Sequence, residues 1–349
     1  MKSAGTRKVV IICGMLLIWV GLIWCFGCAS GAPPADEEEL KGFIYVVNED
    51  EDTVSVIEPN TNSVVATLTV GAWPHYASAS PDGKKVYVSN GEENSISVID
   101  SATNQVVSTI QLKGKGEPGD PQEIAISPGG KYVYVPMFDT NEVIVVDVVS
   151  EVLVDSIPVG ESPISISLSR DGKRCYVVCI HDPISSVIDT TTNRVITTFH
   201  TGEGAAGIDI SPDGSYLYLG GHGMGMWQAI GEKNRDIRKI DTTTFEQLAL
   251  IRCGIMPIGV RFSPDGTFAA VVSHGSGELH IIDSETSEAT RIKVGNNCYV
   301  AAVSDDGRWV YVTNKDDDTL SVADALAKKV IATIPVGHSP KGVTTTVSY

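Results

Sequence analysis

The sequence predicts an all-β fold, a seven-bladed β-propeller in which each blade is a four-stranded antiparallel sheet. Three observations predict it. A turn motif repeats along the chain, a strand motif follows most of these turns, and the last repeat lacks strands that the N-terminal part of the chain supplies. A fixed period of this kind is typical of repeat architectures.

The repeating turn is Ser-Pro-Asp-Gly or a close variant. Three of the steps between its glycines are 41 or 42 residues long, and two steps of 47 and 52 residues carry insertions. Proline presets the second position of such a turn, and glycine supplies the positive φ that the turn needs. The turns begin at Ser80, Ser127, Ser169, Ser211, Ser263 and Ser304.

Each unit of the repeat contains four short strand-like runs. In the unit that starts at His75, the runs are 75–80, 84–90, 95–100 and 105–112, and turn-forming residues separate them. The second run opens with a tyrosine and alternates between polar and apolar residues, as a half-buried strand does. Four strands in a repeat of about 42 residues are typical of a propeller blade.

The last repeat ends after its first strand, since 341–348 matches the innermost strand of a blade. The three missing strands occur near the start of the chain, at 43–48, 53–58 and 63–70. We therefore expect the segment near 343–347 to pair with the segment near 44–47 and to close a ring of seven blades. Seven third strands end in an acidic residue, at Glu58, Asp100, Asp147, Asp189, Asp241, Asp283 and Asp324.

These motifs give the chain a resemblance to YVTN-family β-propellers. The motif stands at Tyr311-Val312-Thr313-Asn314, with close variants at Tyr45-Val46-Val47-Asn48 and Tyr87-Val88-Ser89-Asn90. The resemblance covers 42–349, which we assign to the propeller domain. It implies the fold but no single function, because similar propellers include surface-layer and scaffold modules, lactonase-like enzymes and the copper-bearing propeller of nitrous-oxide reductase.

The N-terminal segment predicts an extracytoplasmic protein tethered to a membrane. Basic residues precede an uncharged apolar stretch over 9–26, and Cys28 follows it. Residues 1–27 resemble a bacterial lipoprotein signal, in which Cys28 is lipidated. The alternatives are an uncleaved membrane anchor, since the stretch is about as long as a bilayer span, and a plain cleaved signal. All of them place the propeller in the periplasm or at the cell surface.

Composition limits the partners of this protein. Residues 28–41 are small, proline-bearing and acidic, and we expect a flexible tether there. The net charge is −17, and removal of residues 1–27, which hold three cations and no acids, leaves −20. Such a charge does not suit binding to nucleic acid. With 42% apolar residues, the body can bury a large core, and we expect a monomeric propeller.

Strand directions place the connections between strands on two faces. Turns after the first and third strands share one face, the turn face, and they are short and regular. Loops after the second and fourth strands share the opposite face, the loop face, and they carry the variation in length and composition. We expect recognition to occur on the loop face.

The mouth of the central channel on the loop face is the first candidate site. Loops of the pattern Gly-x-x-Pro lead into the innermost strands, so residues near these prolines should ring the channel. A rim that mixes aromatic, cationic, imidazole and amide groups suits a small ligand or a peptide tip. A solvated mouth without a ligand is the alternative. The predicted ligand-binding residues are Trp73, His75, Gln122, Met256, Tyr299, His338 and Lys341.

Three histidines form the second candidate site. His222 and His274 each lie eight residues after their turn glycines, and His181 lies nine residues after its own, on three consecutive blades. Imidazoles that face one another across a groove would bind copper or zinc. However, equivalent positions on adjacent blades diverge with radius, so surface histidines are the alternative. Carboxylates in the same loops would suit calcium, or would only keep the surface soluble.

The cysteines of the propeller leave two alternatives open. Cys253 and Cys298 lie before and after the sixth blade, where a disulfide between them is conceivable. The other alternative is that these two and the remaining pair, Cys175 and Cys179, are small buried apolar side chains. Cys175 and Cys179 cannot bond to each other, because they lie four residues apart on one strand.

The motifs of common catalytic centres are missing from the sequence. There is no nucleophile elbow, no metalloprotease helix and no Walker-type loop. The sequence therefore favours a non-catalytic binding or scaffold propeller that recognises a protein, peptide, glycan or small ligand on the loop face. The alternative is a metal- or cofactor-dependent propeller enzyme or redox accessory protein, lactonase-like or copper-binding, that uses the same face.

Overall fold

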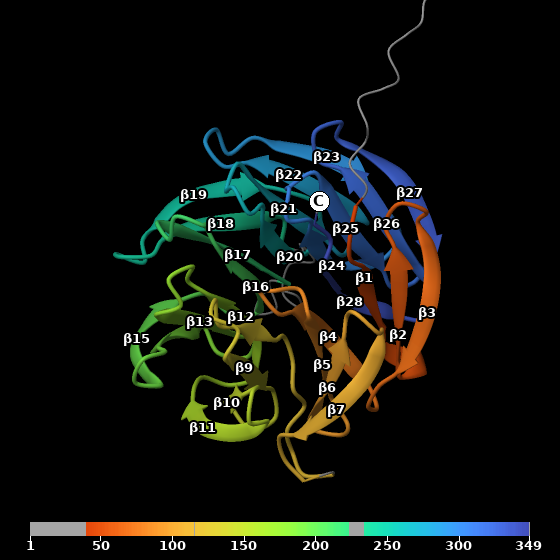
Figure 1. The fold of residues 1–349 in the computed structure, drawn as a ribbon. Coiled ribbons are helices and arrows are strands. Elements are labelled where there is room, and N and C mark those ends of the chain that lie inside the picture. The colour runs from red at the N-terminus through yellow and green to blue at the C-terminus, as the bar shows by residue number, and fades with distance from the viewer. Residues whose placement is uncertain (1–39, 115, 223–233, 349) are drawn as a thin grey trace, which may run out of the picture. The chain divides into compact units, whose positions relative to one another are not determined.

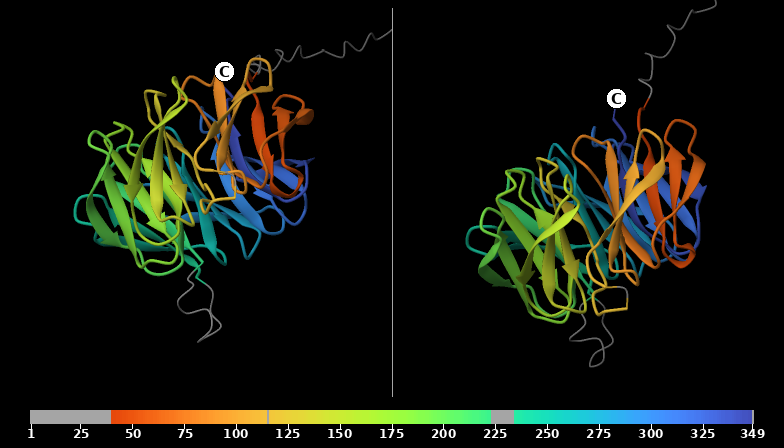
Figure 2. Two further views of the ribbon diagram at one scale, coloured as in Figure 1. Left: turned by 90° about the horizontal axis from the view of Figure 1, so that it is seen from below. Right: turned by 60° about the horizontal axis from the view of Figure 1, so that its bottom comes forward.

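Seven four-stranded antiparallel sheets surround a central axis in the computed structural model (Figures 1 and 2), which describes residues 40–114, 116–222 and 234–348. The predicted fold class is confirmed, including the number of blades. Among the described residues the single helical element is the short 3-10 helix η1 (Glu49–Glu51), and no helix has the length and apolar character that a membrane crossing requires. The predicted signal and Cys28 lie outside the described residues.

The first three blades contain the ring closure and the shortest strand. Blade 1 consists of β28 (Pro340–Thr345), β1 (Ile44–Asn48), β2 (Thr53–Glu58) and β3 (Ser63–Thr69). Blade 2 consists of β4 (Pro74–Ala79), β5 (Lys85–Asn90), β6 (Ser95–Asp100) and β7 (Gln105–Gln111). Blade 3 consists of β8 (Ala125–Ile126), β9 (Tyr132–Met137), β10 (Glu142–Asp147) and β11 (Val152–Pro158).

The other four blades follow the repeat in chain order from the innermost strand outward. Blade 4 consists of β12 (Pro163–Leu168), β13 (Arg174–Cys179), β14 (Ile184–Asp189) and β15 (Arg194–His200). Blade 5 consists of β16 (Ala205–Ile210), β17 (Tyr216–Gly221), β18 (Asp236–Asp241) and β19 (Gln247–Arg252). Blade 6 consists of β20 (Pro257–Phe262), β21 (Phe268–Ser273), β22 (Glu278–Asp283) and β23 (Ala289–Lys293). Blade 7 consists of β24 (Cys298–Val303), β25 (Trp309–Asn314), β26 (Thr319–Asp324) and β27 (Lys329–Pro335).

The ring closes where the two ends of the propeller meet. β28 pairs with β1 in antiparallel orientation, with Thr344 opposite Tyr45 and Val343 opposite Val46. Figure 2 shows the C-terminal end, in blue, beside the first strands, in red. The predicted closure of the ring by the C-terminal strand is therefore confirmed.

The Ser-Pro-Asp-Gly turns form a repeated hydrogen-bonded unit. In the first turn, Ser80 Oγ donates to Asp82 Oδ1 at 2.7 Å, and the Lys84 backbone N–H donates to the same oxygen at 3.1 Å. Gly83 adopts a φ of +68°. The serine-to-aspartate bond recurs in blades 4, 5, 6 and 7. These side chains satisfy the polar groups of the turn, which explains why the motif repeats on the turn face.

The Tyr-Val-x-Asn motif ties the second strand of a blade to the third. Asn90 Nδ2 lies 3.0 Å from both Ser95 Oγ and Ser97 Oγ on the next strand. Asn48 and Asn314 donate to hydroxyl groups of their own blades in the same way. The tyrosines at the equivalent place in six of the second strands are buried, at Tyr45, Tyr87, Tyr134, Tyr176, Tyr218 and Tyr311. The motif therefore has a structural role within the blade and does not indicate a ligand-binding site.

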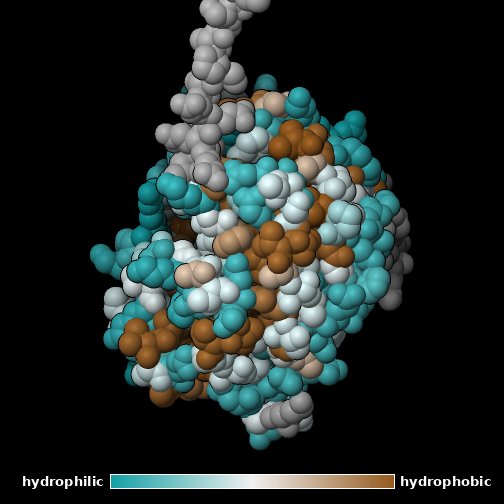
Figure 3. Space-filling model, turned by 45° about the vertical axis from the view of Figure 1, so that its right-hand side comes forward, coloured by the Kyte–Doolittle hydropathy of each residue, from teal (hydrophilic) through white to brown (hydrophobic). Residues whose placement is uncertain are grey.

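The outermost strands expose apolar side chains around the ring. Figure 3 shows apolar patches, in brown, scattered among polar residues, in teal, on the outer side of the propeller. Because six of the seven outermost strands share this pattern, it is a property of the repeat and does not mark one docking surface. Exposed examples, one from each of these strands, are Val65, Val107, Leu153, Ile196, Leu250 and Ile331.

Candidate functional site

Two sets of loops meet at the channel mouth, and one backbone hydrogen bond joins them in every blade. The residue directly after each second strand donates its N–H to a residue that precedes the innermost strand, as Gly91 does to the Trp73 carbonyl at 2.8 Å. The accepting residue has a positive φ in all seven blades, which is uncommon for bulky residues such as Trp73 and Met256. The hydrogen bond fixes the backbones of the two loops relative to each other in every blade.

This hydrogen bond also defines a ring of residues around the mouth, of which the sequence had singled out only His222 and His274. The ring position is the first residue after each second strand, and it lies beside the residues predicted from the innermost strands. Its occupants are Glu49, Gly91, Phe138, Ile180, His222, His274 and Lys315. The signal that could have found them is their constant place directly after the Tyr-Val-x-Asn strand.

Five polar side chains form a charge cluster on one side of the mouth. The Glu49 carboxylate lies 2.9 Å from His75 Nδ1 and 2.8 Å from Lys341 Nζ, and it also contacts Lys315 Nζ. His75 Nε2 lies 2.8 Å from Asp120 Oδ1, and its Nδ1 lies 2.7 Å from Lys341 Nζ. The cluster therefore links blades 1, 2 and 7 with the loop between blades 2 and 3.

The centre of the charge cluster is removed from solvent. Glu49 is 4% exposed, His75 1% and Lys341 8%. Burial acts to raise the pKa of Glu49, but hydrogen bonding with His75 and the attraction of Lys341 and Lys315 lower that pKa below its ordinary value. Burial lowers the pKa of Lys341, and the attraction of Glu49 opposes this change. Glu49 is therefore an ionised carboxylate shared by two lysines.

Two aromatic rings border the charge cluster. Trp73 is 44% exposed and packs edge to face on His75, with 4.7 Å between the ring centroids. The ammonium groups of Lys315 and Lys341 lie 5.8 Å and 5.7 Å from the centroid of the Tyr299 ring. Burial, with a smaller effect of the Glu49 charge, raises the pKa of Tyr299 to about 12. The mouth thus presents an exposed indole and an uncharged phenol beside the cluster.

The opposite side of the mouth is an apolar wall. Ile180, Ala206, Met256 and Ile258 form a buried cluster on blades 4, 5 and 6 and the loops that lead into them. Tyr299 packs against this wall and so joins it to the charge cluster. A few fixed polar groups beside apolar surface are typical of ligand sites.

Side chains close the channel beneath the mouth. Glu123 accepts a hydrogen bond from Ser165 Oγ at 2.5 Å, and it contacts the guanidinium group of Arg261 from across the channel. Asp209 accepts from the Phe262 backbone N–H at 2.9 Å, and burial raises its pKa. The free volume between these groups and the mouth is about 20 Å³, which holds roughly one or two water molecules.

The predicted mouth residues divide into two groups. His75, Tyr299 and Lys341 meet around Glu49, and Trp73 lies beside them. These four residues, predicted from three separate repeats, therefore share one location.

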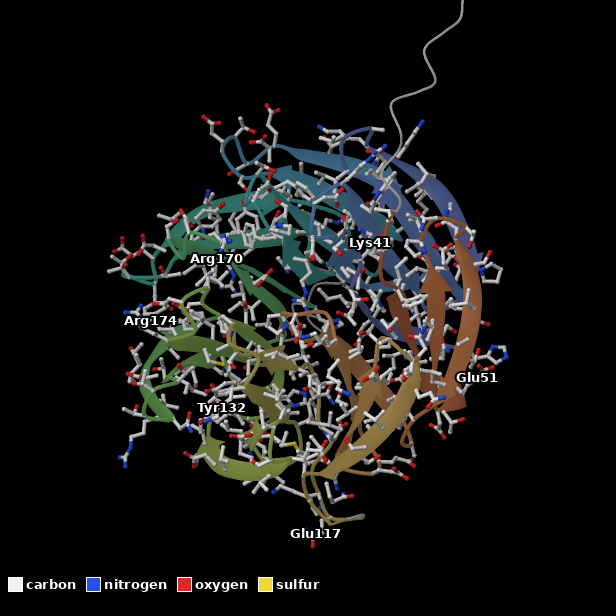
Figure 4. The ribbon with its side chains drawn as sticks, in the orientation of Figure 1. Lys41, Glu51, Glu117, Tyr132, Arg170 and Arg174 are labelled. Atoms are coloured by element: carbon white, nitrogen blue, oxygen red, sulfur yellow. The ribbon has the colours of Figure 1, made fainter. Side chains whose placement is uncertain are left out.

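The other three predicted residues have different surroundings. Gln122 is buried, and its backbone N–H donates to the Pro136 carbonyl at 3.0 Å. Met256 belongs to the apolar wall. His338 contacts acidic residues instead of the charge cluster: its Nδ1 lies 2.8 Å from Asp318, and its Nε2 lies 3.6 Å from Glu51, which Figure 4 labels.

Two of the three predicted histidines are neighbours. The rings of His222 and His274 have centroids 6.1 Å apart, and the His274 ring lies 5.5 Å from the Tyr299 ring. Burial, with a smaller effect of His274, lowers the pKa of His222 to about 4. His222 is therefore uncharged at neutral pH.

The third histidine lies outside this pair. His181 packs against Phe138, with ring centroids 5.8 Å apart, and its Nδ1 lies 3.0 Å from Ser162 Oγ. The reason is its spacing, because Ile180 occupies the ring position on that blade and His181 comes one residue later. Within the described ranges, no group of three or more His, Cys, Asp or Glu side chains is placed to hold a metal ion. The three histidines therefore do not form one metal-binding group.

The cysteines of the propeller are free thiols. Cys175, Cys179, Cys253 and Cys298 are all buried, so the conceivable disulfide between Cys253 and Cys298 is not formed. Burial raises the pKa of both of these thiols to about 12. Neither is a thiolate at neutral pH, which does not suit a nucleophile.

Two protein-family models match parts of the chain. The YNCE-like β-propeller model matches residues 23–141, and the Cytochrome D1 heme domain model matches residues 224–346. A search among curated proteins found no match.

Solved structures with the same fold include two of different origin. Hydrazine synthase from Kuenenia stuttgartiensis has a TM-score of 0.68 and 22% identity, over 78% of this chain and 89% of that chain. A functionally unknown protein from Desulfotomaculum acetoxidans has a TM-score of 0.72 and 13% identity, over 87% of this chain and 99% of that chain. At these identities, the likeness shows the fold.

Proposed function

Because this chain is a β-propeller repeat protein of the YVTN type, we propose that it is a non-catalytic binding module that recognises its ligand at the channel mouth. The ligand is a protein, peptide, glycan or small molecule that contacts Trp73 and the accessible members of the charge cluster, Lys315 and Asp120. The N-terminal segment would hold the propeller outside the cytoplasm, on a membrane.

The charge cluster is the observation that carries this proposal. On blades 4, 5 and 6, apolar side chains such as Ile258 fill the mouth. Packing at these positions therefore does not require charged side chains. On blades 1 and 2 the equivalent positions hold Lys341 and His75, both buried and both in contact with Glu49. Buried ion pairs seldom stabilise a protein more than apolar residues of similar size do. Fixed charges at a channel mouth, beside an exposed tryptophan, are instead suited to recognition.

Truncation of the exposed indole tests this proposal. We expect Trp73→Ala to weaken ligand binding about 30-fold or more, since loss of a central tryptophan typically costs about 2 kcal/mol or more of binding energy. The ligand is captured on the immobilised protein from a membrane extract of the native cells. The matched control is Leu326→Ala, at an 82% exposed residue on the turn face. Equal capture by both variants would contradict the proposal.

Lipid attachment at Cys28 is tested separately. If the N-terminal segment is a lipoprotein signal, Cys28→Ser abolishes incorporation of labelled palmitate and releases the propeller from the membrane fraction. Cys25→Ser is the matched control, because this cysteine would be removed with the signal. If the Cys28→Ser protein stays in the membrane fraction, the result favours the uncleaved anchor. If the wild type incorporates no palmitate and is itself soluble, the result favours a plain cleaved signal.

A redox accessory protein is the second candidate function. The match of 224–346 to the Cytochrome D1 heme domain model favours it, together with the likeness to hydrazine synthase. The described residues do not fit a haem inside the channel, because about 20 Å³ is free there and the contact between Glu123 and Arg261 closes it. An optical spectrum after incubation with haemin separates the two candidates: a stoichiometric Soret band from bound haem would support the redox role.

A further inference from the structure

His222 and His274 carry an inference that does not depend on the ligand of the mouth. We infer that these two residues form a two-coordinate site for cuprous ion at the edge of the apolar wall. The sequence offered three histidines for a metal, and the geometry selects two of them.

The distance between the rings matches one shared ion. A metal lies about 2.0–2.1 Å from a ligating imidazole nitrogen, so with roughly 1.1 Å from nitrogen to ring centre, two rings on one ion have centroids at most about 6.4 Å apart. The observed separation is 6.1 Å, with 75° between the ring planes. With one nitrogen of each ring on the ion, this separation corresponds to a wide angle between nitrogen, metal and nitrogen.

The fold brings the two rings to this distance. Both histidines occupy the ring position, directly after β17 and β21, and their backbone N–H groups donate to Gly204 and Met256 at 2.8 Å and 3.0 Å. The distance between equivalent positions on adjacent blades grows with their distance from the central axis. At the mouth this distance from the axis is small, so two neighbouring side chains lie close enough to share an ion. The loop hydrogen bonds hold the Cα atoms in place, and only the side chains need to adjust.

The surroundings favour a monovalent copper ion over other metals. Zinc in proteins takes four ligands in a tetrahedron, and calcium takes six or more oxygens. The described residues around the pair offer neither set, because the apolar wall and the Tyr299 ring border it. Imidazole is a good copper ligand, and Cu(I) accepts two ligands in line. A single positive charge also costs less to desolvate beside apolar side chains than a double one.

The experiment is an anaerobic titration of the full chain with Cu(I), in competition with a chromogenic chelator. We expect the wild type to bind one copper ion at this site. His222→Gln and His274→Gln should each weaken this binding at least about 100-fold, since loss of even a supporting residue costs 10- to 100-fold. His181→Gln is the matched control and should bind as the wild type does. Circular dichroism confirms that each variant is folded.

X-ray absorption of the copper-loaded wild type provides a test that needs no variant. We expect nitrogen ligands with the signature of imidazole. Copper held by sulfur alone would assign the metal to cysteine or methionine and overturn the inference. The inference is also overturned if the wild type binds no Cu(I), if all three variants bind equally, or if equimolar zinc displaces the copper.

Discussion

Glu49→Gln is expected to lower the free energy of unfolding by about 3–5 kcal/mol, the usual cost of breaking a buried ion pair by removal of one partner. The substitution leaves Lys341, which is 8% exposed, and Lys315 without their shared carboxylate. It also weakens the contact between blades 1, 2 and 7, where the ring closes.

Urea unfolding at neutral pH measures this effect. The control is Asp50→Asn, which removes the same charge from the next residue of η1, an exposed position, and which should change stability by less than about 0.5 kcal/mol. If Glu49→Gln costs no more than this control, the lysines are adequately solvated without Glu49 and the charge cluster is not an energetic unit.

The pH dependence of the same two proteins gives an independent check. The pKa of Glu49 is lowered in the folded protein from its ordinary value of 4.5. Its contribution to stability is therefore fully present above about pH 4.5, and it is lost as the pH falls toward the folded pKa. Between these limits, the wild type should lose more stability on acidification than Glu49→Gln does. Parallel curves for the two proteins would contradict the assignment of Glu49 as the shared counter-ion.

Gly207→Ala is expected to destabilise the propeller by at least about 3 kcal/mol, at the upper end of what overpacking usually costs. Gly207 lies on β16, and a Cβ atom there would be 1.8 Å from the Ile258 carbonyl oxygen on β20 of the next blade. Backbone atoms cannot move aside as a flexible side chain can, so the innermost strands of blades 5 and 6 would have to separate.

A second glycine on the turn face is the matched control. Gly129→Ala would place its Cβ atom in open space, with no neighbour within 4 Å, so the change should be neutral or stabilising by up to about 1 kcal/mol. The midpoint of urea unfolding should fall clearly for Gly207→Ala alone. Similar midpoints for both variants would mean that blades 5 and 6 approach less closely than the structure indicates.

The fold was predictable because its signals are local. Turn residues such as Ser80 and Asp82 bond within their own turn, and the amide of Asn90 bonds to hydroxyl groups only five and seven residues away. The strands and turns of each repeat are therefore specified by residues of that same repeat. The count of seven blades then followed from the match between the incomplete last repeat and the strands near Tyr45.

The mouth was only partly predictable. The positions that ring the channel follow from the repeat, and His75, Tyr299 and Lys341 were identified in this way. Glu49 and Lys315, which hold the cluster together, were indistinguishable from the other charged residues of their loops. His181 and His222 differ by one residue in their spacing from the turn glycine, and that one residue separates a mouth position from its neighbour.

By itself, the sequence determined the blade and the face on which variation gathers, because these depend on contacts within one repeat of the chain. It also determined the number of blades, because the incomplete last repeat matches the first strands of the chain. Only the tertiary structure decided which side chains meet. Glu49 and Lys341 are 292 residues apart in the chain and 2.8 Å apart in space, since closure of the ring brings the first and last strands into one blade. The repeat predicts that these two strands pair, but which side chains then meet at the mouth depends on the conformation of the loops, which no local pattern encodes.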